Sequence, residues 1–76
     1  MAQYVVIKSS PSWGVPTDYV WVGGTWINIH EISDDGAQPK VWYSSRAAQE
    51  FASKQKLDAN ESVAVMKFEQ LKAKSR

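Results

Sequence analysis

Two adjacent glycines, Gly23 and Gly24, limit the possible folds of this chain more than any other feature. They separate two runs rich in β-branched and aromatic residues, 19–22 and 25–32. A two-residue reversal between antiparallel strands needs positive φ, which glycine adopts without steric cost. We therefore predict a β-hairpin whose turn is Gly23-Gly24.

The position of this turn predicts the strand register, with Trp21 opposite Trp26 and Tyr19 opposite Asn28. Side chains alternate along a strand, so the hairpin separates into two faces. The aliphatic face holds Val20, Val22, Thr25, Ile27 and Ile29, and the aromatic face holds Tyr19, Trp21, Trp26, Asn28 and His30. We expect a helix to pack on the aliphatic face.

The flanking segments predict further elements. Residues 4–8 and 40–43 have strand-like composition. Residues 9–18 are rich in proline and hydroxyl side chains, which predicts a loop that Trp13 and Val15 attach to the body. Residues 33–39 are predicted to form a second turn.

The period of the apolar residues changes after residue 43. Ser44 or Ser45 is predicted to cap a helix over residues 46–56, with Phe51 as its anchor on the sheet. Residues 62–71 fit a strand, which we favour, but also a second helix that begins with a capping box between Asp58 and Glu61.

The resulting prediction is a small α+β fold, an antiparallel sheet with one helix packed on one face, in the order β-β-β-β-α-β. The chain has 76 residues, enough for one domain. Residues 1–71 are expected to form this domain, and residues 72–76 a basic C-terminal tail.

The sequence favours a binding role over catalysis. It contains no cysteine, and His30, the one histidine, shares its predicted face with no serine, lysine or aspartate. Asp34-Asp35-Gly36 resembles a cation loop, but the following residues lack the oxygen ligands that calcium needs. We expect no enzyme activity, cofactor or metal. The lack of cysteine, of a signal segment and of a long apolar run predicts a cytoplasmic protein without a membrane partner.

The aromatic face of the hairpin is the leading candidate for function. Its rings either clamp the hairpin through a covered Trp21–Trp26 pair or form an exposed interaction patch, and the two interpretations are compatible. We predict a non-enzymatic protein-binding module of the adaptor or inhibitor type, with a homodimer through the same face as a variant. The predicted contact residues are Tyr19, Trp21, Trp26, Asn28 and His30, with Trp13 and Trp42 as contributors.

Nucleic-acid binding is the alternative. The net charge is only +1, and no Lys or Arg lies between Lys8 and Lys40, the interval that holds the hairpin aromatics. Phosphate binding needs cations, so this alternative depends on the basic C-terminal end. Its candidate residues are Lys67, Lys72, Lys74 and Arg76.

Overall fold

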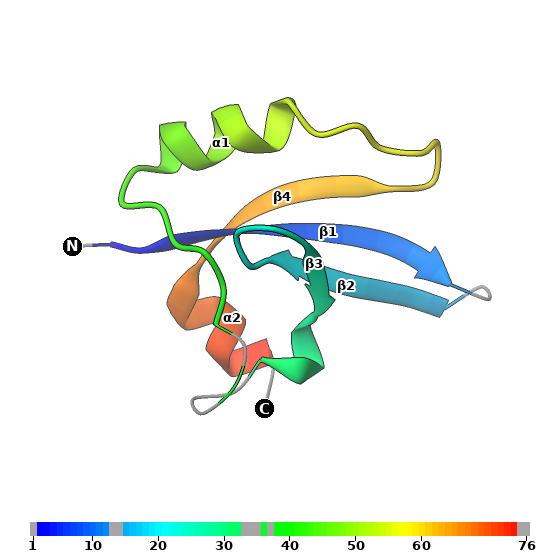
Figure 1. Cartoon of the computed structure of the whole chain (residues 1–76), viewed down its shortest axis with the longest axis horizontal. Helices are drawn as coiled ribbons and strands as arrows, with labels where there is room; N and C mark the ends of the chain where they lie inside the picture. The colour runs from blue at the N-terminus through cyan, green and yellow to red at the C-terminus, as the bar shows by residue number, and fades with distance from the viewer. Residues whose placement is uncertain (1, 13–14, 33–35, 37, 75–76) are drawn as a thin grey trace.

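The computed structural model describes residues 2–12, 15–32, 36 and 38–74 and contains an antiparallel sheet with helices (Figure 1). Within these residues the sheet has four strands in the order β3-β2-β1-β4. The elements are β1 (Tyr4–Ser12), β2 (Val15–Trp21), β3 (Trp26–Asn28), the 3-10 turn η1 (Ile29–Glu31), α1 (Ser45–Ser53), β4 (Ser62–Lys67) and α2 (Phe68–Lys74). The predicted fold class, a small antiparallel sheet with a helix packed on one face, is confirmed.

The hairpin between β2 and β3 has the predicted register. Trp21 pairs with Trp26, Val20 with Ile27, and Tyr19 with Asn28. The turn is closed by the backbone N–H of Val22, which donates to the carbonyl of Thr25 at 3.1 Å. Gly23 has φ of +103°, a conformation that side chains with a Cβ rarely adopt. The diglycine therefore sets the register for the reason predicted.

The predicted loop over residues 9–18 was wrong, because its described part belongs to a hairpin arm. β1 and β2 pair from Ile7–Val20 out to Ser12–Val15, and the pair near the tip joins Pro11 to Pro16. Two opposed prolines fit only where neither N–H is needed by the ladder, and such positions point outward from the ribbon. Trp13, predicted to attach this segment to the body, lies outside the described residues.

The predicted strand over residues 40–43 is reduced to a single bridge. Tyr4 and Trp42 exchange two backbone hydrogen bonds of 2.8 Å each. Two residues earlier, the Lys40 N–H donates to the carbonyl of Trp21 at 3.0 Å. This coil thus enters between the end of β2 and the beginning of β1, where the β1–β2 pairing stops. The coil is hydrogen-bonded to both strands but is not itself a strand.

Residues 62–71 were predicted to be either strand or helix, and they contain a strand followed by a helix. β4 runs antiparallel to β1 from Ser62 to Lys67, and α2 follows directly. The Phe68 N–H donates to the carbonyl of Gln3 at 2.9 Å, which fastens the junction. α2 continues to Lys74, so residues 72–74 of the predicted tail are helical and 75–76 lie outside the described residues.

The other helix begins as predicted. Ser44 is the N-cap of α1, and its hydroxyl accepts from the Ala47 N–H at 3.4 Å. The helix extends to Ser53, three residues short of the predicted end.

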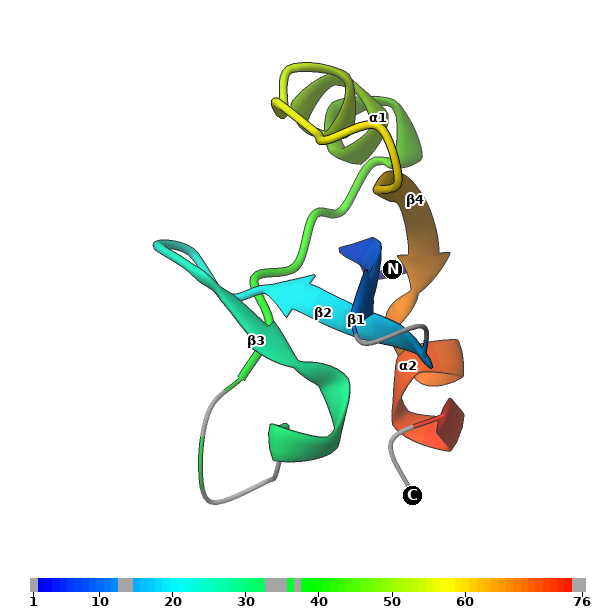
Figure 2. The ribbon, with the colours of Figure 1, turned by 90° about the vertical axis from the view of Figure 1, so that its right-hand side faces the viewer.

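Two small cores lie on opposite faces of the sheet, one under α2 and one under α1 (Figures 1 and 2). The first comprises Val5, Ile7, Val20, Ile29 and Leu71, and the second comprises Val6, Ala48 and Ala52. The prediction that the helix after residue 44 packs on the aliphatic face was therefore wrong. That face is covered by α2 and η1, because Leu71 and Ile29 join its core, and α1 packs on the aromatic face instead.

Gly23→Ala is expected to lower the free energy of unfolding by about 1–2 kcal/mol, because a Cβ is strained at this φ. A Cβ at either glycine meets no atom within 4 Å, so the cost is purely conformational. Gly24→Ala is the matched control, since no left-handed φ is found there. Urea unfolding measures both, and equal losses of stability would contradict the assignment of strain to Gly23.

Candidate protein-binding surface

Four rings from separate segments form an aromatic cluster between α1 and the hairpin. Trp21 and Trp26 form the cross-strand pair, with ring centroids 5.3 Å apart at an interplanar angle of 66°. Phe51 of α1 lies 5.3 Å from the Trp21 ring and 5.0 Å from the Trp42 ring. Edge and tilted contacts at these distances are favourable for aromatic pairs. The cluster therefore joins β2, β3, α1 and the coil at residue 42.

Lys8, from the inner strand β1, also lies on this face of the sheet. The Lys8 ammonium lies 5.0 Å from the centre of the Trp26 ring and 5.8 Å from that of Tyr19. The register explains this position, since Lys8 pairs with Tyr19 across β1 and β2. A cation over an aromatic face is attracted by the ring quadrupole. Lys8 thus holds both rings from the side of β1.

Glu61 neutralises this lysine from the segment before β4. Its carboxylate lies 3.6 Å from the Lys8 ammonium and accepts from the Asp58 N–H at 3.0 Å. The hydrogen bond from Asp58 contributes most to a lowered pKa of Glu61, followed by a hydrogen bond with Ser10 and the charge of Lys8. The ionised carboxylate therefore fastens the 58–61 turn to β1.

The predicted contact residues on the hairpin share one half-buried face. Tyr19, Trp21, Trp26 and Asn28 are brought together by the strand register, and Trp42 joins them through Phe51. The face was predicted to be either covered or exposed, and it is partly both. Phe51 covers part of Trp21, yet all these residues keep some contact with solvent.

His30 does not lie on the strand, contrary to its predicted place on the aromatic face. β3 ends at Asn28, whose side-chain oxygen accepts from the His30 N–H at 2.9 Å and so caps η1. Asn28 competes for backbone N–H groups in this way more readily than it continues a strand. The alternation of faces therefore stops before His30, which is exposed.

Sequence reasoning missed several residues of this surface. Phe51 was expected to anchor a helix, but its aromatic partners were not foreseen. Lys8 was overlooked because its register with Tyr19 exists only if β1 and β2 form the hairpin arm. Tyr43 is the exposed large hydrophobic residue of the described chain, with 60% of its surface accessible, and no pattern in the sequence distinguished it.

Two of the candidate nucleic-acid residues are fully described, Lys67 in the edge strand β4 and Lys72 in α2. Lys67 ends β4 and is exposed, and the Lys72 ammonium lies 4.9 Å from the Phe68 ring. Lys74 is in α2 without a described side chain, and Arg76 lies outside the described residues. β3 and β4 are at opposite edges, so Lys67 does not flank the hairpin aromatics.

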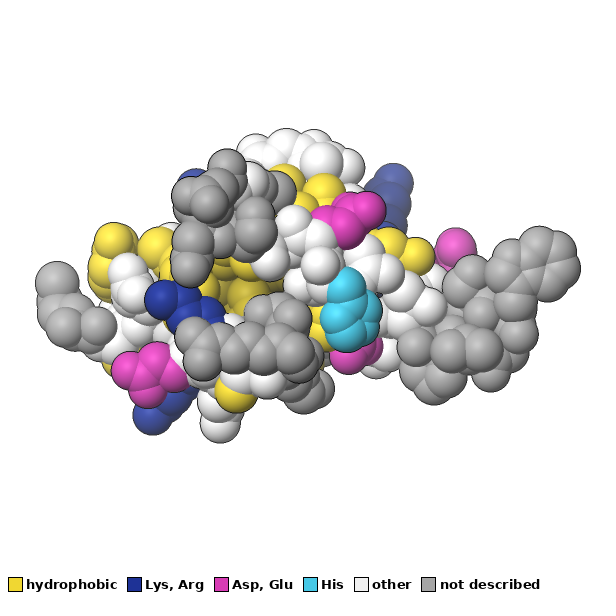
Figure 3. Space-filling model, turned by 90° about the horizontal axis from the view of Figure 1, so that it is seen from below, with side chains coloured by type: hydrophobic (Ala, Val, Ile, Leu, Met, Phe, Trp, Pro, Cys, Tyr) yellow, Lys and Arg dark blue, Asp and Glu magenta, His cyan; other side chains and the backbone are white. Residues whose placement is uncertain are grey.

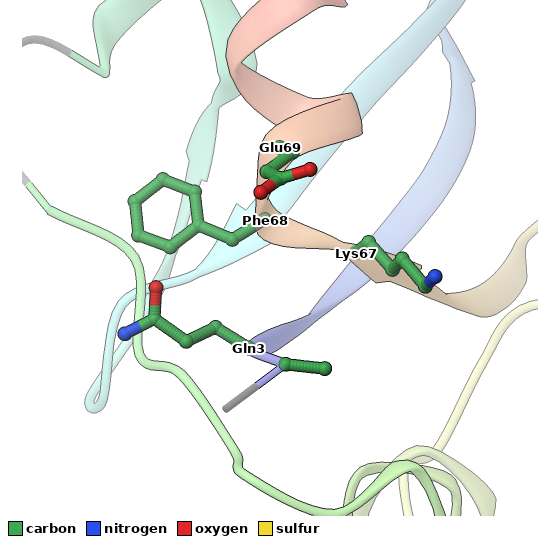
Figure 4. A pocket seen from close by; sticks show the side chains of 5 residues that line it. Gln3, Lys67, Phe68 and Glu69 are labelled. Carbon is green, nitrogen blue, oxygen red and sulfur yellow. The ribbon is translucent and has the colours of Figure 1, made fainter.

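A shallow pocket of about 160 Å³ lies at the β4–α2 junction (Figure 4). It is lined by Ala2, Gln3, Lys67, Phe68 and Glu69. The Phe68 ring and the Gln3 side chain lie on one side, whereas the Lys67 ammonium points the other way. Its polar groups therefore do not converge on a point where a small molecule would react.

The described residues offer little for metal binding or for crossing a membrane. Within them, no three His, Asp or Glu side chains gather closely enough to hold an ion. Neither α1 nor α2, nor any other described helix, combines the length and apolar character that a bilayer span requires. Seen from the side of α2, hydrophobic side chains reach the surface between charged ones, and the histidine is exposed beside them (Figure 3).

No family model, curated protein or solved structure matches this chain.

Phe51→Ala is expected to lower the free energy of unfolding by about 2–3 kcal/mol, less than for a fully buried phenylalanine. It should also increase acrylamide quenching of the tryptophan emission, because Trp21 and Trp42 lose a neighbouring ring. Gln49→Ala, an exposed change on the same helix, is the control and should leave both unchanged. Unaltered quenching in folded Phe51→Ala would show that α1 does not cover these rings.

Glu61→Gln is expected to reduce the dependence of stability on acidic pH. Folding lowers the pKa of the Glu61 carboxyl below 4.5, the value in the unfolded chain. The carboxylate therefore stabilises the protein at pH values above 4.5, and this contribution is lost as the pH falls through the lower pKa of the folded state. The stability difference between the wild type and the variant should be constant above about pH 5 and shrink below about pH 4. Urea unfolding across this range measures it, and parallel profiles would contradict the contact.

Proposed function

We propose that this chain is a non-enzymatic protein-binding module of the adaptor or inhibitor type. Its contact surface is the hairpin face, defined as Tyr19, Trp21, Trp26 and Asn28. The observation that carries the proposal is the β2–β3 register, which gathers three half-buried rings on one face beside an edge strand. Each ring is held by the fold while part of it stays accessible to a partner.

Rings fixed in this way suit a binding surface because little side-chain freedom remains to be lost on association. Trp21 is held by Trp26 and Phe51, and Trp26 is also held by Lys8. Rigid Trp and Tyr side chains supply large contact areas at low entropic cost and are enriched among hot spots. The hairpin face therefore combines the preferred residue types with preorganisation.

The surroundings extend this surface without blocking it. The turn residues Gly23, Gly24 and Thr25 are exposed, and exposed His30 follows Asn28 at the other end of β3. Trp42 contributes through its contact with Phe51. Trp13 stays a predicted contributor outside the described residues. Binding would act by occupying the partner's surface, and we place it in the cytoplasm because the sequence has no cysteine.

Nucleic-acid binding through Lys67, Lys72, Lys74 and Arg76 receives less support. Stacking of bases needs rings and cations in one groove. Lys8, which lies over the Trp26 and Tyr19 rings, is paired with Glu61, and Lys67 lies in the strand at the opposite edge. Retention of the intact protein on a polyanion column at high salt would reverse this ranking.

Trp26→Ala is expected to weaken partner binding at least about tenfold, the effect of losing a hot-spot side chain. Purified protein serves as bait in extracts of the source cells, and captured proteins are identified and then titrated. Tyr43→Ala is the matched control, because it removes an exposed aromatic ring that is not part of the hairpin face. Partners of the wild type should be retained by Tyr43→Ala and lost by Trp26→Ala.

Trp26 also packs against the core under α1, so stability must be separated from binding. Each variant is compared at a temperature where circular dichroism shows it fully folded. If folded Trp26→Ala and a second variant, Tyr19→Ala, both bind partners with wild-type affinity, the hairpin face is not the contact surface.

A further inference from the structure

The outer edge of β4 is an open strand edge. β4 pairs on one side with β1 and is last in the strand order. It is six residues long, with Val63 and Val65 half-buried against the core under α1. Within the described part of the chain, no backbone hydrogen bond from another segment reaches this strand on its outer side. A regular row of donors and acceptors is thus available there.

The ladder identifies which backbone groups point outward. Tyr4 exchanges hydrogen bonds with Trp42 on the side of β1 away from β4, so the N–H groups of the next residue, Val5, and of Ile7 point toward β4. Their partners Met66 and Ala64 therefore bond inward. It follows that the backbone groups of the alternate residues, Val63, Val65 and Lys67, point outward.

The other open edges of the sheet are protected and this one is not. In the hairpin arm, Pro11 and Pro16 each remove an outward N–H, and β3 is only three residues long before η1 turns the chain away. Proline and very short strands are common means of preventing edge-to-edge pairing. The centre of β4, residues 63–66, contains neither proline nor charge.

We propose that β4 pairs antiparallel with β4 of a second copy of this chain, on a two-fold axis at Ala64. In this register Val63 exchanges backbone hydrogen bonds with Val65 of the second copy, and both have outward groups. Lys67 then lies opposite Glu61 of the second copy. Because these two residues have opposite charge and flank an uncharged centre, the edge is complementary to itself.

The surrounding structure is compatible with this pairing. Ala64, on the axis, is small and exposed, and Lys67 is exposed with a flexible stem that can reach a carboxylate. Lys8 lies 3.6 Å from one oxygen of the Glu61 carboxylate and the Asp58 N–H donates to the other, but a carboxylate has about four acceptor positions and can accept from a second cation. The hairpin face lies toward the opposite edge and stays accessible on both copies.

Two substitutions test the proposal by sedimentation equilibrium of the full chain. Val65→Pro removes an outward N–H but no bond to β1, and proline is tolerated on such an edge. It should abolish the dimer at concentrations where the wild type dimerises. Lys67→Glu places like charges opposite each other at both ends and should raise the dissociation constant at least about tenfold. Lys56→Glu, an exposed change of the same charge outside β4, should have no effect.

Hydrogen exchange gives an independent measurement. The amides of Val63 and Val65 should exchange more slowly as protein concentration rises, and Lys67→Glu should abolish this slowing. This measurement does not depend on whether Val65→Pro folds. A wild type that stays monomeric up to millimolar concentration overturns the proposal. A dimer that persists unchanged in Lys67→Glu and in folded Val65→Pro overturns it too, because it must use another surface, such as the hairpin face.

Discussion

The ring of Phe51 between Trp21 and Trp42 is the contact on which the arrangement of this domain depends. It links α1 to β2 and to the coil that enters between β1 and β2. The helix otherwise presents small side chains, Ala48 and Ala52, which allow close approach to Val6 but bury little area themselves. The larger contact therefore decides which face of the sheet α1 covers, and the aromatic face offers Phe51 its partners.

The helix was predicted on the aliphatic face because only one helix was expected. Residues 68–74 form a second helix, which supplies Leu71, and Phe68 packs beside it against the same core. Once this face has its own cover, the aromatic face is left for α1. Periodicity in residues 62–71 fitted both a strand, which was favoured, and a helix, because the chain changes from one to the other between Lys67 and Phe68. No local rule fixes such a junction, which depends on the length of β1 available for pairing.

Features set by neighbouring residues were predictable, and features set by distant ones were not. The diglycine gave the β2–β3 register and Ser44 gave the helix cap, since both follow from local geometry. The arm at Pro11 and Pro16 was interpreted as a loop from its composition. Composition does not reveal that both prolines occupy positions whose N–H the ladder leaves unused. For the candidate surface, the shared face of Tyr19, Trp21, Trp26 and Asn28 was predicted, but His30 was wrongly placed on it. The positions of Lys8 and Phe51 required tertiary structure.

The two edges of this sheet differ in the groups that they expose. A sheet this small cannot enclose large rings completely, so aromatic side chains on the hairpin face serve the core and the surface together. Any partner that contacts Trp26 therefore binds a group that also contributes to stability, and binding and folding are thermodynamically coupled at that edge. At β4 the side chains of Val63 and Val65 turn toward α1, and only backbone groups face outward. Pairing there would leave the core unchanged, so the proposed association through β4 would be independent of the proposed recognition through the hairpin face.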